Sequence, residues 1–302
     1  MRFSIFQDSV IGARQVNQDR MGYSYTRECL LLIVADGMGG HLRGEVAAQL
    51  TLQAVGGLFQ RRARPVLADP AGFLDQALQA AHRDILRYQQ EHQMPESPRT
   101  TVVAAIIQHG HIWWAHAGDS RLYWLRDGRV HQRTEDHSKV QSLLRMGLIR
   151  PEEQETHPER NKVLNCLGSP FAPQIELNGA HALRRGDHLL LCSDGVWACV
   201  PETDFIGLIE SEALRDAVPK LVRRAVVQSG PAADNATALV VRWEADDAPG
   251  GFSSADMPEG AMTTTIAMTR DDEQAGTEEI TEDEIERTIS EIRAAIERSG
   301  GR

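Results

Sequence analysis

Short apolar runs that end at turn residues constrain the fold of this chain more than any other feature. Runs of this length, rich in strand-forming residues, are typical of buried β-strands. Two of them flank the tetrapeptide Arg-Asp-Gly-Arg, which indicates a β-hairpin. We therefore expect strands at Glu28–Ala35, His111–Ala117, Leu122–Leu125, Val130–Thr134, His188–Cys192 and Thr237–Trp243.

Longer segments between these runs carry apolar residues at helical spacing. On one face of the segment 70–91 the sequence places Phe73, Ala77, Leu78, Ala81 and Ile85. Helices are expected at Gly44–Phe59, Pro70–Glu91, Pro201–Ser211 and Leu214–Gln228. Many strands with short turns, and helices between only some of them, favour an α+β sandwich over a regular array of βαβ units.

The acidic charge of the chain is confined to its C-terminal tail. The 302 residues carry a net charge of −11. Residues 244–302 contain 16 acidic and 5 basic side chains, so this segment accounts for the whole excess. Because the remaining residues are balanced and no basic cluster is present, the sequence predicts no nucleic-acid binding.

Segments that could cross or enter a membrane are not apparent in the sequence. The longest apolar run, Cys29–Ala35, is far too short to span a bilayer. The N-terminus lacks the long apolar core of a secretory signal. The four cysteines show no Cys-x-x-Cys spacing, and three of them lie in apolar contexts typical of reduced core residues. We expect a cytoplasmic protein.

Aspartates recur at the ends of the expected strands. Asp36 lies in VADGMGG, Asp119 in HAGDSR, Asp194 in LLCSDG and Asp234 in AADNATALVV, while Asp19 lies in RQVNQD near the start. Taken singly, each motif is more typical of a turn or a helix cap. Carboxylates are also the oxygen ligands that Mg²⁺ and Mn²⁺ prefer. Strands that end in one region would bring these ligands together, so their recurrence favours a metal site.

These motifs resemble those of a known family. The chain is similar to the PPM-type, metal-dependent Ser/Thr protein phosphatases (protein phosphatase type 2C) in their bacterial form. The resemblance covers nearly all of residues 1–243 and implies a four-layer αββα sandwich of two antiparallel sheets flanked by helices. It rests, in family order, on GARQVNQDR (12–20), VADGMGGHLRGEVAA (34–48), RTTVVAAII (99–107), AHAGDSRLYWLRDGRVHQRTEDHS (115–138), LLLCSDGVW (189–197) and DNATALVV (234–241).

The resemblance implies a metal-binding role for most of these aspartates. Asp36 would bridge two ions, and Gly37 would bind through its carbonyl, which no Cβ obstructs. Asp194 and Asp234 would complete the ligands of the first ion. Asp119 resembles the aspartate that binds a third ion together with Asp194 in bacterial members. The implied cofactor is Mn²⁺ or Mg²⁺, as two ions with a possible third.

The resemblance also implies how the phosphate is bound and attacked. Asp19 would hold a metal-bound water. Arg14 resembles the arginine that grips the substrate phosphate, a task that suits a guanidinium fork, although without the family context it would be interpreted as a surface charge. Two ions would lower the pKa of a bridging water, and the resulting hydroxide would attack phosphorus in line.

The general acid is less clear from the sequence. Eukaryotic members carry a histidine two residues after the bridging aspartate, where this chain has Met38. His41 lies nearby and either protonates the leaving oxygen, contacts the substrate, or only packs the loop at the start of a helix. A metal-bound water is the alternative general acid. In LNCLG, Asn165 stands where many relatives carry an arginine. The resemblance therefore does not imply that this chain makes the contact of that arginine.

The sequence predicts three regions. Residues 1–243 are expected to form the catalytic domain, with a flap at about 138–183 that takes part in substrate selection. Residues 244–280, acidic and rich in Gly, Pro, Ser and Thr, are expected to be a disordered linker. A capping box at Thr281 and isoleucines at helical spacing predict a short amphipathic helix over 281–299.

The implied function is hydrolysis of phosphoserine and phosphothreonine on proteins, opposing a bacterial Ser/Thr kinase. The threonines within Thr263–Thr269 are either phosphorylated and bound by a phosphothreonine-binding module, or part of an inert linker. A catalytically weak binding or scaffold protein acting through its acidic tail is the alternative function. The presence of every expected metal aspartate argues against that alternative.

Overall fold

The computed structural model describes residues 1–38, 43–154, 156–244, 254, 257–258 and 260–266. Contacts group Met1–Ile266 into one compact unit. The predicted helix over 281–299 lies outside the described residues.

Two antiparallel sheets form the centre of this unit. The five-stranded sheet has the order β1-β10-β9-β6-β7, and the six-stranded sheet has the order β11-β2-β3-β4-β5-β8. The first sheet comprises β1 (Arg2–Val10), β10 (Ala236–Glu244), β9 (His188–Cys192), β6 (Arg121–Arg126) and β7 (Arg129–Arg133). The second comprises β11 (Thr263–Thr264), β2 (Asp19–Tyr25), β3 (Cys29–Gly37), β4 (Thr100–Gln108), β5 (His111–Ala117) and β8 (Glu176–Ala182).

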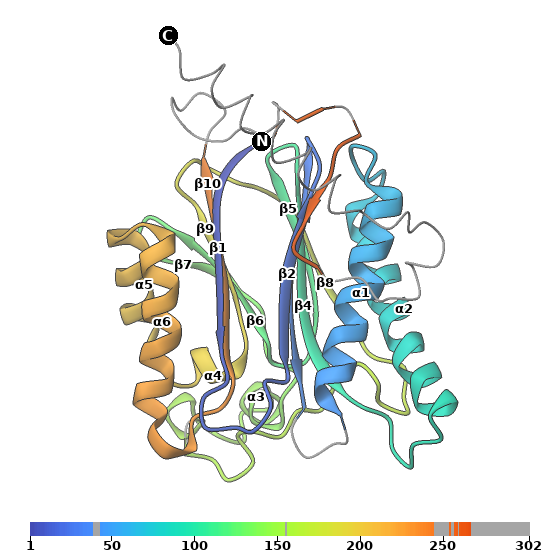
Figure 1. The fold of residues 1–302 in the computed structure, drawn as a ribbon. Helices are drawn as coiled ribbons and strands as arrows, with labels where there is room; N and C mark the ends of the chain where they lie inside the picture. Colours follow the sequence, from blue (N-terminus) through green and yellow to red (C-terminus); the bar gives the residue numbers. More distant parts are fainter. Residues whose placement is uncertain (39–42, 155, 245–253, 255–256, 259, 267–302) are drawn as a thin grey trace, which may run out of the picture. The chain divides into compact units, whose positions relative to one another are not determined.

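Helices cover the outer face of each sheet (Figure 1). α1 (Gly44–Arg62) and α2 (Pro70–Glu91) pack on the six-stranded sheet, while α5 (Glu202–Ser211) and α6 (Leu214–Ser229) pack on the five-stranded sheet. The expected αββα sandwich is therefore confirmed. Shorter elements are α3 (Lys139–Arg145), α4 (Asp194–Trp197) and the 3₁₀ turns Pro151–Glu153 and Gly230–Ala232.

The central strand β3 shows why its sequence is continuously apolar. Leu30, Leu32 and Val34 point into the layer between the two sheets. Leu31 and Ile33 alternate with them and pack against α1 and α2. A strand buried on both faces requires apolar residues at every position rather than at every second one. The same argument applies to β4, which is buried along its whole length.

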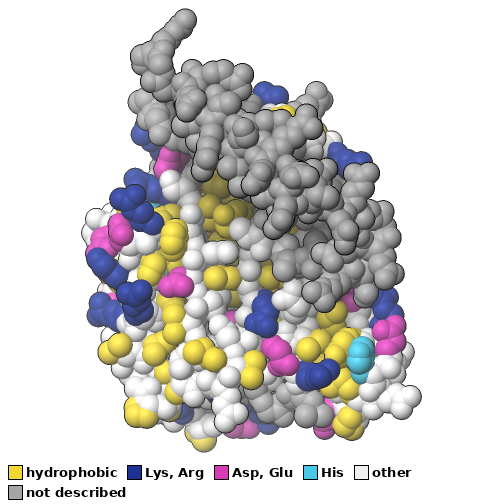
Figure 2. Space-filling view, viewed as in Figure 1, with side chains coloured by type: hydrophobic (Ala, Val, Ile, Leu, Met, Phe, Trp, Pro, Cys, Tyr) yellow, Lys and Arg dark blue, Asp and Glu magenta, His cyan; other side chains and the backbone are white. Residues whose placement is uncertain are grey.

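Two segments differ from the sequence-based expectation. β8 lies inside the range expected for the flap, yet it pairs with β5 at the edge of the six-stranded sheet. β11 lies inside the range expected for the linker, yet it pairs with β2. The compact unit thus extends to Ile266, beyond the expected domain end at 243. Figure 2 shows apolar, basic and acidic side chains intermixed on the face seen in Figure 1.

Candidate metal centre

The ends of several strands from both sheets meet at one pocket of about 370 Å³. Its lining includes six candidate site residues singled out from the sequence: Arg14, Asp36, Gly37, Asp119, Asp194 and Asp234. The lining residues are Arg14, Gln18, Asp36, Gly37, Met38, Thr101, Asp119, Asn161, Val163, Asp194, Asp234 and Asn235. A hollow of the same volume lies at the other end of β10, beside Arg185, Gly186 and Arg242–Glu244, away from this carboxylate cluster.

Antiparallel pairing explains why these aspartates converge. Asp36 lies near the end of β3, and Asp19, the first residue of β2, is its partner across the ladder. Asp119 follows β5, and Asp194 begins α4 directly after β9. Asp234 precedes β10, the strand that pairs with β9. Residues separated by more than 200 positions therefore reach one end of the sandwich.

Gly37 is required by close packing as well as by any role of its carbonyl. A Cβ atom at this position would lie 2.4 Å from the backbone carbon and oxygen of Gly44 and 2.7 Å from the carbonyl oxygen of Gln18. A Cβ at Gly44 would in turn lie 2.7 Å from Gly37. Two glycines thus let the end of β3 touch the first residue of α1.

Burial and mutual repulsion raise the pKa of the clustered carboxyl groups. Desolvation raises the pKa of Asp36 well above its usual range, and the charges of the other four aspartates add to this effect. The same causes raise the pKa of Asp119, where the charge of Asp194 makes the largest electrostatic contribution after desolvation. For Asp194, desolvation followed by repulsion from Asp234 and Asp19 raises the pKa to about 7. The site therefore carries more negative charge than its surroundings stabilise.

One carboxylate oxygen of Asp19 shows this unbalanced negative charge. Its Oδ2 accepts a hydrogen bond of 2.7 Å from Ser193 Oγ, which accepts one of 3.1 Å from the Thr237 amide. Its Oδ1 is buried and receives no hydrogen bond from the described donors. Asp19 lies opposite Asp36 in the ladder between β2 and β3, and Asp36 and Asp194 line the same pocket. Carboxyl groups this close require either a shared proton or a cation between them, so the donor set fits a divalent ion.

Arg14 reaches the pocket and forms a two-bond ion pair with Asp234. The bonds are 2.8 Å from Nε to Oδ1 and 2.5 Å from Nη2 to Oδ2. The side chains remain 53% and 39% exposed, so the pair can rearrange in contact with solvent. A metal ion bound by Asp234 would need a carboxylate oxygen that now accepts a hydrogen bond from the Arg14 fork. The two cations therefore compete for this carboxylate.

Asn235 and Ser193 support the site but were not selected from the sequence. Asn235 Oδ1 accepts a 2.8 Å bond from the Gln18 amide, and its Nδ2 donates to the carbonyl oxygens of Ile11 and Val16 at 2.8 and 3.2 Å. Asn235 thereby ties the loop that carries Arg14 to the start of β10. Ser193 precedes Asp194 and Asn235 follows Asp234. This adjacency was the sequence signal that could have identified them as supporting residues.

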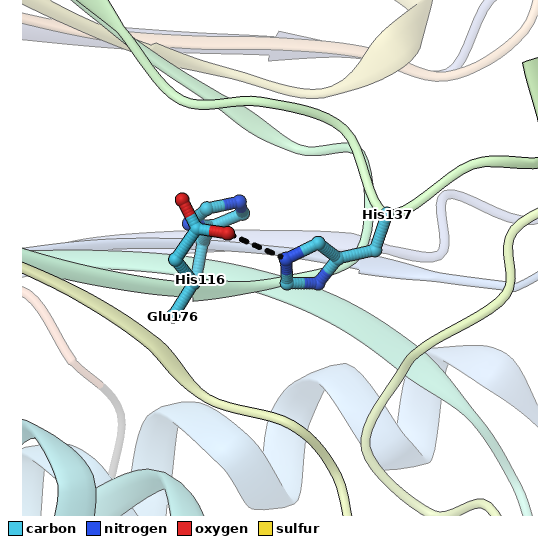
Figure 3. A group of neighbouring side chains, drawn as sticks. All are labelled: His116, His137 and Glu176. Carbon is cyan, nitrogen blue, oxygen red and sulfur yellow. Dashed lines mark hydrogen bonds and ion pairs between the residues drawn. The ribbon is translucent and has the colours of Figure 1, made fainter. Parts of the chain in front are cut away.

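A histidine cluster lies beside Gly118, the residue before Asp119, and Figure 3 shows its members. His116, His137 and Glu176 offer ligand atoms within 4.8 Å of one another. The amide of Asn165 is oriented by two bonds to the backbone of Gln174, of 2.8 and 3.0 Å. Its Nδ2 therefore donates to His137 Nδ1 at 2.7 Å. The Gly118 amide also donates to Nδ1, at 3.3 Å.

These bonds assign the tautomer of His137. Because Nδ1 accepts, the neutral ring carries its proton on Nε2, which faces Glu176 Oε2 at 3.3 Å. The rings of His116 and His137 are stacked, with centroids 4.5 Å apart, whereas a shared ion must lie in the plane of both rings. Burial, followed by the neighbouring His137, also lowers the pKa of His116. We interpret the cluster as hydrogen-bonded support for Gly118.

Two further expectations concern regions near and beyond the site. His41, the candidate acid, lies outside the described residues and stays a prediction. In the part of the chain that the structure describes, no helix is long and apolar enough to cross a membrane.

Known proteins share both the sequence and the fold of this chain. The family model for protein phosphatase 2C matches residues 6–229. The serine/threonine phosphatase stp of Listeria monocytogenes is 32% identical over 231 residues, which cover 76% of this chain and 90% of that protein. The serine/threonine protein phosphatase PstP of Mycobacterium tuberculosis is 34% identical over 230 residues, covering 76% and 43% respectively.

Solved structures superpose on the sandwich. The crystal structure of M. tuberculosis PstP/Ppp has a TM-score of 0.72 and 33% identity, covering 81% of this chain and 100% of that one. The catalytic domain of PstP in complex with two manganese ions has a TM-score of 0.68 and 31% identity, covering 80% and 98%. These likenesses support an active enzyme over the alternative of a scaffold. The chain belongs to the protein phosphatase 2C family and is a metal-dependent protein serine/threonine phosphatase, whose substrates are phosphorylated proteins.

Proposed function

We propose that the pocket holds two divalent ions, Mn²⁺ or Mg²⁺, shared by Asp36. The other groups of this centre would be the Gly37 carbonyl, Asp194 and Asp234. The observation that carries the proposal is the meeting of Asp36, Asp194 and Asp234 in one pocket, where Asp19 pairs with Asp36 across the ladder and has a buried oxygen that receives no hydrogen bond from the described donors. A relative crystallised with two manganese ions supports the same number here.

The ions, when bound, would offset the carboxylate charge, polarise the phosphoryl group and activate water. The remaining work falls to the residues of the chain. Arg14 would bind two equatorial phosphate oxygens through its fork once Asp234 no longer occupies it. Asp19, held by Ser193, would accept a hydrogen bond from a water in the pocket. Asp119 would bind a third ion together with Asp194, and His41 would protonate the leaving oxygen.

Metal titration followed by an activity assay tests this proposal. Calorimetry of the chelator-stripped enzyme is expected to give at least two Mn²⁺ ions per chain. Hydrolysis of a phosphothreonine peptide is expected to need the metal and to stop on addition of chelator. Full activity in chelator would overturn the proposal, as would a stoichiometry below two.

Replacing Arg14 with alanine is expected to lower kcat/KM about 100-fold, the usual effect of losing one preorganised donor to a transition-state oxygen. Arg14→Lys should recover only part of this loss, because an ammonium group cannot form the two-bond contact. Steady-state kinetics on a phosphopeptide measure both variants. Arg61→Ala, on the exposed side of α1, is the control and should match the unaltered enzyme.

His137 is proposed to position the turn that carries Asp119. The backbone amide of His137 donates to the Gly118 carbonyl at 2.9 Å, and its ring Nδ1 accepts from the Gly118 amide. Asparagine can place an acceptor where Nδ1 lies, whereas glutamine places its amide near Nε2. We expect His137→Gln to weaken Mn²⁺ binding about tenfold, a usual effect of altering a residue that orients a ligand.

Metal titration by calorimetry checks the effect at His137, with His137→Asn expected to bind Mn²⁺ nearly normally. Glu176→Gln serves as the control, because it alters only the group facing Nε2. Equal losses in His137→Asn and His137→Gln would contradict a role for the Nδ1 acceptor.

The partners proposed from the sequence are a Ser/Thr kinase that this enzyme opposes and a phosphothreonine-binding module that binds the tail. Thr263 and Thr264 are exposed in β11, which supports access by a kinase. Residues 267–269 lie outside the described chain. Mass spectrometry of protein co-expressed with its kinase tests this proposal, and an absence of phosphate on Thr263–Thr269 would contradict it.

A further inference from the structure

Residues 263–266, here called the latch, add a strand to the edge of the six-stranded sheet. Thr263 and Thr264 pair with Tyr25 and Ser24 of β2. The orange-red strand beside β2 in Figure 1 is this segment. The latch therefore covers backbone groups that an edge strand would otherwise expose.

Thr265 continues the pairing through its side chain. Its amide donates to the Tyr23 carbonyl at 2.9 Å. Its hydroxyl oxygen accepts from the Tyr23 amide at 2.9 Å and donates back to the Tyr23 carbonyl at 3.3 Å. One hydroxyl thus acts as both donor and acceptor toward a single residue of β2. Thr265 is nevertheless exposed, so its hydroxyl lies where solvent and an enzyme can approach.

Ile266 fills a hole made by two glycines from different elements. A Cβ at Gly22 of β2 would lie 2.7 Å from Ile266 Cγ1. A Cβ at Gly56 of α1 would lie 2.9 Å from Ile266 Cγ2 and 3.0 Å from its Cδ1. Ile266 is only 3% exposed and belongs to the core between α1 and the sheet. Any side chain at Gly22 or Gly56 would close this hole.

Both elements that hold the latch also begin at the candidate metal centre. β2 starts at Asp19, and α1 starts at Gly44, which packs on Gly37. The latch therefore fastens the far ends of two elements whose near ends build the site.

We propose that the latch is releasable and that phosphorylation of Thr265 opens it, uncovering the edge of β2 and the hole between Gly22 and Gly56. This inference rests on the proposed modification of the tail and identifies which threonine governs the closed state. Thr263 and Thr264 lie exposed in the paired strand, whereas only the Thr265 hydroxyl bonds to both backbone groups of Tyr23.

The chemistry of the modification explains the opening. A nucleoside-triphosphate-dependent protein kinase would form a bond between Thr265 Oγ1 and the terminal phosphorus. The bond from that phosphorus to the nucleoside diphosphate breaks, and the hydroxyl proton is released. The ester oxygen can no longer donate to the Tyr23 carbonyl, and a phosphate dianion is placed beside that carbonyl oxygen. The closed latch therefore loses the hydrogen bond from Thr265 to the Tyr23 carbonyl, and the phosphate repels that carbonyl oxygen.

Hydrogen exchange of the Tyr23 amide tests the proposal in the full chain. Phosphothreonine would be installed at position 265 or, as the matched control, at 263, in an Asp36→Asn background that prevents self-hydrolysis. We expect phosphorylation at 265 to speed exchange at least about tenfold and phosphorylation at 263 to leave it unchanged. Without phosphate, Thr265→Val should also speed exchange, whereas Thr265→Ser should not.

The glycine hole supplies an independent test of the closed latch. Gly56→Ala should lower the melting temperature of the otherwise unaltered protein, because the new Cβ collides with Ile266. In an Ile266→Ala background the same change should raise it, because alanine favours a helix and the collision is gone. A melting temperature that falls equally in both backgrounds would overturn the packing of Ile266 into the hole between Gly22 and Gly56.

Equal Tyr23 exchange with and without phosphate at 265 would overturn control by Thr265. Faster exchange with phosphate at 265 supports that control even if mass spectrometry finds no phosphate on the tail of co-expressed protein. That second result would refute only the proposed modification in the cell.

Discussion

Replacing Asp36 with asparagine is expected to abolish phosphatase activity and, at the same time, to stabilise the metal-free protein. The proposed ions share this carboxylate, so activity should fall at least about 1,000-fold. Without metal, Asp36 is repelled by four other aspartates and is desolvated, which raises its pKa well above the usual range. Asparagine keeps the shape and removes the charge, so the metal-free variant should unfold at a higher temperature than its parent near pH 8.

Phosphopeptide hydrolysis with Mn²⁺ and thermal unfolding in chelator measure these two effects. Asp127→Asn is a suitable control, because Asp127 lies in the exposed β6–β7 turn with a positive φ that asparagine tolerates. Activity in Asp36→Asn close to that of the unaltered enzyme would contradict the assigned role. A metal-free variant less stable than its parent would contradict the electrostatic argument.

The metal-free enzyme is expected to lose stability as pH rises from about 4 to about 8. The pKa of Asp194 is raised from 3.8 to about 7 in the folded protein. Below pH 4 the group is protonated in both states and imposes no penalty. Between the two pKa values the unfolded chain releases the proton and the folded chain retains it, so unfolding becomes more favourable as pH rises. For Asp194 alone, the free energy of unfolding falls by roughly 4 kcal/mol across this pH range.

Mn²⁺ is expected to reverse this loss. Binding to the folded state alone raises the melting temperature in proportion to the logarithm of metal concentration above the dissociation constant. Thermal unfolding at pH 5 and pH 8, in chelator and in Mn²⁺, measures both effects, with Asp194→Asn expected to flatten the pH dependence. Chelated enzyme equally stable at both pH values would refute the electrostatic argument, and an unchanged melting temperature in Mn²⁺ would refute the metal site.

Sequence patterns identified some strands better than others for a physical reason. β5 and β9 were predicted with their observed bounds, because apolar runs there end at turn residues. β1 and β2 were not predicted as strands, because polar residues and Gly22 interrupt their apolar pattern. β8 was assigned to the flap, because its sequence, Glu-Leu-Asn-Gly-Ala-His-Ala, has no continuous apolar run. Pairing with β5 stabilises it where local propensity does not.

The site shows the same division between local and long-range information. Asp36, Asp119, Asp194 and Asp234 were identified from the sequence, because their chemistry and neighbours are local, and the structure brings them to one pocket. The supporting groups depend on contacts between distant segments. The amide of Asn165 orients His137, which lies 28 residues away in the chain. Asn235 holds the loop of Arg14 through bonds to residues 219 and 224 positions away.

The sequence by itself determined the fold class and the family, and it identified the carboxylates that the structure brings together, because the residues of each motif are neighbours in the chain and the order of the motifs resembles that of a known family. Only the tertiary structure decided that Arg14 pairs with Asp234, that His137 braces Gly118, and that Ile266 enters the hole between two glycines. Each of these contacts joins segments far apart in the chain. Their existence depends on how sheets and helices pack, which no local pattern of residues encodes.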